Sequence, residues 1–216
     1  MYKYSMYDVV AESSGFCCRE ESANYGKSEV NSNVKDTLFR KLFGNSPSDL
    51  LDLYNALNNS SYTNVDDLEI NIIDDGIYMY IKNGVSFIVD SHMVLIEHQS
   101  TINPNMPLRG LFYFASLYQK YISGEKRYRI YGPGLVKIPA PRFVVLYNGK
   151  NNMKTEKQIL RLSDAFSPQE KDSGFEWTAT VFNINYGHNK EILLKCKKLD
   201  EYCKLVDKIR EYNMQS

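Results

Sequence analysis

Two apolar runs separated by a short polar break constrain the fold of this chain more than any other feature of its sequence. Residues 85–89 and 93–96 are apolar apart from Ser86, and Asp90-Ser91-His92 joins them. This spacing is typical of a β-hairpin. Neither run alternates between apolar and polar side chains, so both faces of the hairpin need a cover. The hairpin therefore predicts a sheet between layers of helices, which is an α/β fold.

The rest of the chain supplies helices and strands for such a sheet. Apolar side chains recur at helical spacing after Asn33, and Gly44 is a natural stop for that helix. Pro47 opens a second helix, and Pro107 precedes a third. We predict helices over 34–43, 47–58, 108–122 and 189–212, strands over 68–73, 85–89, 93–96, 142–147 and 177–184, and an irregular segment over 151–176.

The composition bounds the class of protein. The 216 residues suit one domain, which we place at 32–216, and we expect residues 1–31 to form an N-terminal arm or to be partly disordered. Basic and acidic residues balance at 26 each, so nucleic-acid binding would need a local basic patch. No apolar run approaches the ~18 residues of a membrane span, and the N-terminus lacks a signal-peptide pattern. We expect a cytoplasmic protein with no membrane partner.

The cysteines and histidines show no spacing typical of a metal site. Cys17 and Cys18 are adjacent, so a bridge between them would be strained, and Cys196 and Cys203 are seven residues apart. Cytoplasmic cysteines stay reduced. We therefore expect free thiols and no zinc site.

The predicted hairpin places two polar side chains together at its open end. If Ser91 and His92 form the turn, Ser86 faces Glu97 and Gly84 faces Gln99, and Glu97 and Gln99 share one face. A carboxylate that follows four apolar residues in a covered strand is costly to bury without a partner. An Mg²⁺ ion would be such a partner, and the backbone carbonyl of His98 could be a further ligand. The alternative is a solvated strand terminus.

Several strings of this sequence resemble one nuclease family. Ile96-Glu-His-Gln-Ser-Thr101 followed by Met106-Pro-Leu-Arg109 and Tyr113 resembles the recombination-promoting nuclease (Rpn) family of PD-(D/E)XK nucleases, often labelled transposases. The segments 36–43 and 142–149 are similar to that family's first helix and a later strand. The resemblance covers about residues 33–212. It implies a restriction-endonuclease-like α/β/α sandwich with a central mixed sheet, Mg²⁺ or Mn²⁺ dependence, and endonucleolytic cleavage of DNA.

One residue departs from the family pattern. The family has Asn-Asp-Val-Ser-Phe where this chain reads Asn83-Gly84-Val85-Ser86-Phe87, so Gly84 stands in the place of the principal metal-binding Asp. Asp90 is a poor replacement, because it lies at the turn, roughly 13 Å along the strand. Asp36 is the other acidic candidate, as a metal ligand or simply as an acidic residue favoured near a helix N-terminus.

The resemblance implies roles for the remaining candidates. Glu97 would hold the metal, Gln99 would position water or phosphate, and Asp36 would assist. Arg40 and Lys41 could meet DNA phosphates. Arg109 and Tyr113, four residues apart on one helix face, would orient Glu97 or Gln99 or contact DNA. The basic segment 126–129 combines cations with an aromatic residue, as single-strand contacts do, or is a solvated loop.

Two functions follow from these residues. The first is a metal-dependent DNA endonuclease. The second is a homologue impaired by Gly84, which would bind DNA or regulate an active nuclease. A second copy of the chain is left open as a partner, and no small-molecule organic cofactor is expected.

Overall fold

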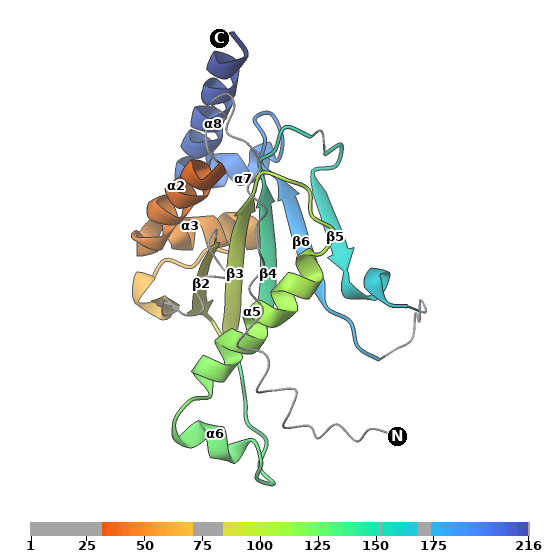
Figure 1. Ribbon diagram of the computed structural model, residues 1–216. Coiled ribbons are helices and arrows are strands. Elements are labelled where there is room, and N and C mark those ends of the chain that lie inside the picture. Colours follow the sequence, from red (N-terminus) through yellow and green to blue (C-terminus); the bar gives the residue numbers. More distant parts are fainter. Residues whose placement is uncertain (1–31, 71–83, 152, 168–173, 216) are drawn as a thin grey trace. The chain divides into compact units, whose positions relative to one another are not determined.

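The computed structural model describes residues 32–70, 84–151, 153–167 and 174–215, so the predicted arm over 1–31 lies outside it. Within these residues the protein is an α/β fold on one six-stranded mixed sheet, which confirms the predicted class (Figure 1). The helices are α2 (Ser32–Gly44), α3 (Pro47–Asn58), α5 (Met106–Tyr121), α6 (Glu125–Arg129), α7 (Lys190–Lys195) and α8 (Lys197–Gln215), with 3₁₀ turns η2 (Val65–Asp67) and η3 (Leu162–Ala165). The strands are β1 (Leu68–Ile70), β2 (Gly84–Val89), β3 (His92–Gln99), β4 (Ala140–Tyr147), β5 (Lys157–Arg161) and β6 (Thr178–Asn183).

The sheet has the strand order β1-β2-β3-β4-β6-β5. The pairs β1/β2, β2/β3 and β5/β6 are antiparallel, whereas β3/β4 and β4/β6 are parallel. Parallel pairing of β3 and β4 requires a crossover connection, and α5 is the main helix of that connection. The C-terminal ends of β3, β4 and β6 therefore lie at one end of the sheet.

Helices cover both faces of the sheet. Alternate residues of β3 and β4 enter two different cores, because strand side chains alternate between faces. Val94, Ile96 and Leu146 pack with α2, α3, α7 and α8, whereas Leu95 and Val145 pack with α5. Figure 1 shows α5 crossing one face of the sheet.

The first two helices form where local signals predict them. Phe39 and Phe43, one turn apart in α2, are fully buried. Ser46 caps α3 by accepting a hydrogen bond from the Asp49 backbone N–H, and proline opens the helix. Asn59 ends α3 in the left-handed conformation, with φ of 53°.

Three segments have a different secondary structure from the one predicted. The segment predicted as one helix over 189–212 is two helices, because Cys196 takes an extended conformation between α7 and α8. The segment 151–176 contains strand β5 and the turn η3 rather than only irregular structure. The basic segment over 126–129, for which no helix is predicted, lies in helix α6.

The hairpin turn lies one position earlier than predicted. Asp90 and Ser91, not Ser91 and His92, form it, with φ values of 44° and 60°. Two successive left-handed residues are the geometry of a type I′ turn, which matches the twist of the flanking strands. His92 instead begins β3, and its Nδ1 lies 2.8 Å from the Asp90 carbonyl oxygen.

This shift changes every pairing in the hairpin by two residues. Gly84 pairs with Glu97 and Ser86 with Leu95, so the predicted pairings of Gly84 with Gln99 and Ser86 with Glu97 are wrong. A slip of two residues keeps each side chain on its face. The prediction that Glu97 and Gln99 share a face is therefore confirmed.

No helix within the described ranges is both long and apolar enough to cross a membrane. Cys196 and Cys203 are free and buried, as expected of reduced thiols.

Candidate functional site

Strand β3 carries a carboxylate and an amide on the sheet face that α5 covers. Glu97 is 1% exposed and Gln99 is 7% exposed. Gln99 Nε2 donates a hydrogen bond to Glu97 Oε1 at 2.9 Å. The two side chains therefore lie buried near the C-terminal end of the strand, which rules out a solvated strand terminus.

Arg109 of α5 is the charged partner of the buried carboxylate. Its Nη2 lies 2.5 Å from Glu97 Oε1. The hydroxyl of Tyr113 accepts hydrogen bonds from Arg109 Nε at 3.0 Å and from Nη2 at 2.7 Å, and Nη1 lies 3.6 Å from Met106 Sδ. Spacings of three and four residues place Met106 and Tyr113 beside Arg109 on the helix. The predicted common face of Arg109 and Tyr113 is confirmed, and it is turned toward Glu97.

Arg109 and Tyr113 each keep one protonation state near neutral pH. Burial lowers the pKa of Arg109, but the nearby Glu97 and Tyr113 more than offset this effect, so the pKa lies above its ordinary value. Burial raises the pKa of Tyr113, and the Glu97 carboxylate raises it further, against the effect of Arg109. Arg109 is therefore cationic and Tyr113 neutral at physiological pH.

Residue 84 faces this carboxylate from the neighbouring strand. Gly84 is the direct cross-strand partner of Glu97. Side chains at such positions lie on one face, with Cβ atoms about 4.5–5.5 Å apart. A carboxylate at position 84 would adjoin that of Glu97, and glycine contributes no side chain there.

His98 lies on the opposite face of the sheet. Its Nε2 and the Tyr202 hydroxyl are 2.9 Å apart, and its ring stacks on Phe39 with centroids 5.5 Å apart. Helix α2 thus packs on the face opposite the Glu97 side chain. Asp36 belongs to α2, but its side chain lies outside the described residues, so its role stays a prediction. Tyr202 was not singled out in the sequence, where its one signal is a place on the apolar stripe of α8.

The described side chains near Glu97 do not fit a divalent metal. Mg²⁺ needs several oxygen ligands, and no group of three or more His, Cys, Asp or Glu side chains converges within the described ranges. Arg109 and Gln99 both bind Glu97 Oε1. Asp90 belongs to the turn, at the other end of the hairpin, and accepts a hydrogen bond from the Tyr62 hydroxyl at 2.5 Å. Asp90 is therefore a turn residue rather than a replacement ligand.

The residues predicted to contact DNA do not form one surface. Lys41 is exposed and Arg40 is half-buried on α2, whereas Arg109 and Tyr113 belong to α5. Tyr113 is only 5% exposed, and its hydroxyl accepts hydrogen bonds from Arg109. The DNA-binding roles of these residues stay predictions.

The segment around α6 is the most exposed aromatic region described. Tyr128 is 81% exposed and Tyr131 is 84% exposed. Arg127 and Arg129 beside them are also exposed. Cations interleaved with exposed aromatic rings are a typical surface for single-stranded nucleic acid.

Comparison with known proteins finds no counterpart. No protein-family model matches the chain, and no curated protein or solved structure is similar to it.

Proposed function

We propose that this chain is a PD-(D/E)XK-type nuclease homologue that binds DNA but has lost most or all of its cleavage activity. One observation carries the proposal: Gly84 lies directly opposite Glu97, and the carboxylate is neutralised by Arg109. A metal-dependent nuclease needs carboxylates that hold the ion which activates water. Here one buried carboxylate has a guanidinium as its partner, and its cross-strand neighbour has no side chain.

The architecture supports the nuclease-like part of the proposal. A hairpin, a crossover helix and a parallel strand succeed one another along the mixed sheet. Glu97 and Gln99 project from one face of β3, as the resemblance requires. The exposed rings of Tyr128 and Tyr131, close in sequence to the exposed Arg127 and Arg129, support the DNA-binding part.

An active Mg²⁺-dependent endonuclease is the second candidate. The shared face and direct contact of Glu97 and Gln99 favour it. It would need a further oxygen ligand from residues outside the described set.

A plasmid-nicking assay with Mg²⁺ or Mn²⁺ separates the two candidates. We expect the native chain to nick no faster than Glu97→Ala, and Gly84→Asp to restore nicking that Glu97→Ala then abolishes. Gly134→Asp is the matched control, because Gly134 has open space around it. Nicking by the native chain that depends on Glu97 would instead establish the endonuclease.

A second readout is independent of activity. Gly84→Asp places a like charge directly across from Glu97, which destabilises the pair without a counterion. Divalent metal should therefore raise the melting temperature of Gly84→Asp and leave that of the native chain unchanged, because only a folded state that binds ligand is stabilised. A band-shift assay in EDTA tests DNA binding itself, and no shift with any DNA would refute that half of the proposal.

A further inference from the structure

The connection between α5 and β4 projects beyond the sheet and carries helix α6 (Figure 1). We call residues 124–138 of this connection the α6 tip. Its base is anchored at two points. The Tyr118 hydroxyl of α5 donates a hydrogen bond to the Pro139 carbonyl oxygen at 2.6 Å, and the Ala140 N–H donates to the Ser91 carbonyl oxygen at 2.8 Å. The α6 tip therefore extends from a fixed base.

Two tyrosine rings of the α6 tip face solvent. Tyr128 is 81% exposed and Tyr131 is 84% exposed. The Tyr131 N–H donates a hydrogen bond to the Tyr128 carbonyl oxygen at 3.3 Å, which closes one turn of the chain between them. Side chains three residues apart in such a turn lie on the same side. The two rings therefore emerge from one side of the α6 tip, one turn apart.

The α6 tip also concentrates positive charge. It contains four basic residues and one acidic residue, in a chain whose basic and acidic residues balance at 26 each. Arg127, Arg129 and Lys137 are exposed and form no ion pair with another described residue. Like charge disfavours contact with a second copy of the α6 tip, so the complementary partner is an anion.

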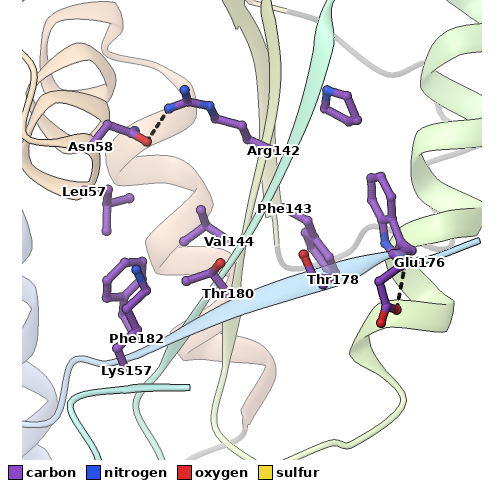
Figure 2. Close-up of a pocket in the computed structure, with 12 residues that line it drawn as sticks. Leu57, Asn58, Arg142, Phe143, Val144, Lys157, Glu176, Thr178, Thr180 and Phe182 are labelled. Atoms are coloured by element: carbon purple, nitrogen blue, oxygen red, sulfur yellow. Dashed lines mark hydrogen bonds between the residues drawn. The ribbon is translucent and has the colours of Figure 1, made fainter. Parts of the chain in front are cut away.

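A cavity of about 350 Å³ over β4 and β6 offers no comparable set of available charges (Figure 2). Arg142 at its edge donates a hydrogen bond to Asn58 Oδ1 at 2.6 Å. The Glu176 carboxylate accepts hydrogen bonds from Ser163 Oγ at 2.7 Å and from the Trp177 N–H at 3.0 Å. These groups are already bonded within the protein, whereas the cations of the α6 tip face solvent.

We propose that the α6 tip binds single-stranded DNA. Cations and rings alternate along the tip as Arg127, Tyr128, Arg129 and Tyr131, and a single strand likewise alternates phosphates with bases. The tyrosine rings stack on unpaired bases, and the arginines bind the neighbouring phosphates. This assignment rests on the proposed DNA binding, and it specifies the form of DNA and the residues that contact it.

The rings distinguish a single strand from the two other anionic partners. A duplex presents phosphates but keeps the faces of its bases inside the stack, so it contacts the arginines alone. An anionic membrane also attracts cations, but it takes up apolar side chains such as Leu135, which is 88% exposed, and offers tyrosine no base on which to stack. Loss of each kind of side chain therefore has a different effect for each partner.

The α6 tip and Glu97 lie toward opposite ends of β3. The connection that carries the tip enters β4 at Ala140, which pairs with His92 at the start of β3. Glu97 lies further along β3, at roughly 17 Å for about 3.3 Å per residue. A strand bound at the tip therefore need not touch the Glu97 carboxylate, as binding without cleavage requires.

Fluorescence anisotropy in EDTA measures the binding. The native chain is titrated into a labelled oligothymidylate of about 16 nucleotides, the upper end of usual site sizes, and into a duplex of the same length. We expect the single strand to bind at least about tenfold more tightly than the duplex, since stacking of one base contributes about that factor. Vesicles of phosphatidylcholine with and without phosphatidylserine test the membrane.

Tyrosine variants test the stacking. Tyr128→Ala/Tyr131→Ala should weaken single-strand binding about tenfold or more and leave duplex binding unchanged, because only unpaired bases stack on the rings. Tyr128→Phe/Tyr131→Phe keeps both rings and should bind as the native chain does. Tyr212→Ala is the matched control, because Tyr212 is 74% exposed on α8, and it should bind normally. The exchanged side chains are exposed, so the variants should fold, which thermal melts check.

Arginine variants test the phosphate contacts. Arg127→Gln/Arg129→Gln should weaken the binding of both forms of DNA. With the single strand, the slope of log affinity against log salt concentration should fall in magnitude by about 0.7 for each phosphate contact that is lost. A purely structural role of the two arginines would leave this slope unchanged.

Two results would overturn the assignment while the proposed DNA binding stands: equal losses in Tyr128→Ala/Tyr131→Ala and Tyr212→Ala, or equal binding of single strand and duplex. Binding to phosphatidylserine vesicles that Leu135→Ala abolishes, without binding of the single strand, would identify a membrane contact instead. If neither form of DNA binds, the proposed DNA binding fails together with the assignment.

Discussion

Burying a carboxylate costs several kcal/mol unless its charge is compensated. Glu97 is compensated by Arg109, whose guanidinium is itself held by Tyr113. The Arg161–Glu176 pair, at 3.5 Å with both side chains more than one-third exposed, is the opposite case. The two pairs use the same chemistry, and burial decides how much each contributes to stability.

Arg109→Gln should therefore destabilise the protein far more than Arg161→Gln. Removing one partner of a buried pair costs about 3–5 kcal/mol, and we expect about 3 kcal/mol, because Arg109 is itself 33% exposed. An exposed pair contributes about 0–1 kcal/mol. Urea unfolding of the two variants measures the difference.

The double variant Arg109→Gln/Glu97→Gln checks the cause of this loss. It should recover much of the lost stability, because no charge is then left buried. If the double variant is no more stable than Arg109→Gln, packing rather than charge governs the site.

The sequence predicts part of this site. The alternation of β3 suffices to place Glu97 and Gln99 on one face, because the period of a strand is fixed. The partner of Glu97 does not follow from spacing. Arg109 reaches the carboxylate only because α5 docks on that face of the sheet, and the sequence leaves open whether Arg109 faces Glu97 or DNA. A metal was the expected partner, whereas the described partner is a guanidinium.

Gly110 of helix α5 packs directly against the side chains of Phe143 and Trp177. A Cβ atom there would lie 2.4 Å from Phe143 Cδ1 and 2.9 Å from Trp177 Nε1. Such distances are far inside van der Waals contact, so the absence of a side chain sets the depth at which α5 packs. Because α5 also carries Arg109, the depth of packing controls the contact with Glu97.

Gly110→Ala should destabilise the protein by about 1–3 kcal/mol, the usual cost of overpacking a core. Alanine favours helix over glycine by up to about 1 kcal/mol, so the observed loss is net of that gain. The change in urea midpoint measures it. Gly134→Ala is the control, because nothing lies within 4 Å of the added atom. Equal stability of the native chain and Gly110→Ala would show that Phe143 can move aside.

The elements that the sequence predicts well are those with strong local signals. Helices α2 and α3 have apolar spacing and a cap or a stop, and their predicted bounds lie within about two residues of those observed. Strand β5 has no such signal, since four of its five side chains are exposed and only pairing with β6 defines it. The break at Cys196 carries neither glycine nor proline, so no local sequence signal predicts it.

At the scale of the whole molecule, the two thiols of the described residues lie in the core between the sheet and its larger helical layer. Cys196 is fully buried and Cys203 is 1% exposed. Burial raises the pKa of the Cys196 thiol to about 11 and that of Cys203 to about 12, from an ordinary value of 9.0. The folded protein therefore keeps both protons over a range in which the unfolded chain releases them.

Stability should consequently fall as the pH rises above about 9. A group whose pKa is raised by folding stabilises the folded state fully below its unfolded pKa, and loses that contribution as the pH climbs toward the folded value. Each thiol that titrates only in the unfolded chain lowers the free energy of unfolding by about 1.4 kcal/mol per pH unit. Urea midpoints measured from about pH 8 to about pH 10.5 give the slope of stability against pH. This range begins below the unfolded pKa of the thiols and ends below both folded values.

The variant Cys196→Ala/Cys203→Ala is the control. It should be less stable than the native chain at about pH 8, because alanine leaves the core underfilled, but its stability should fall less steeply with pH. If the slopes of the two proteins coincide, tyrosines with raised pKa values such as Tyr118, at about 12, account for the alkaline loss instead of the thiols.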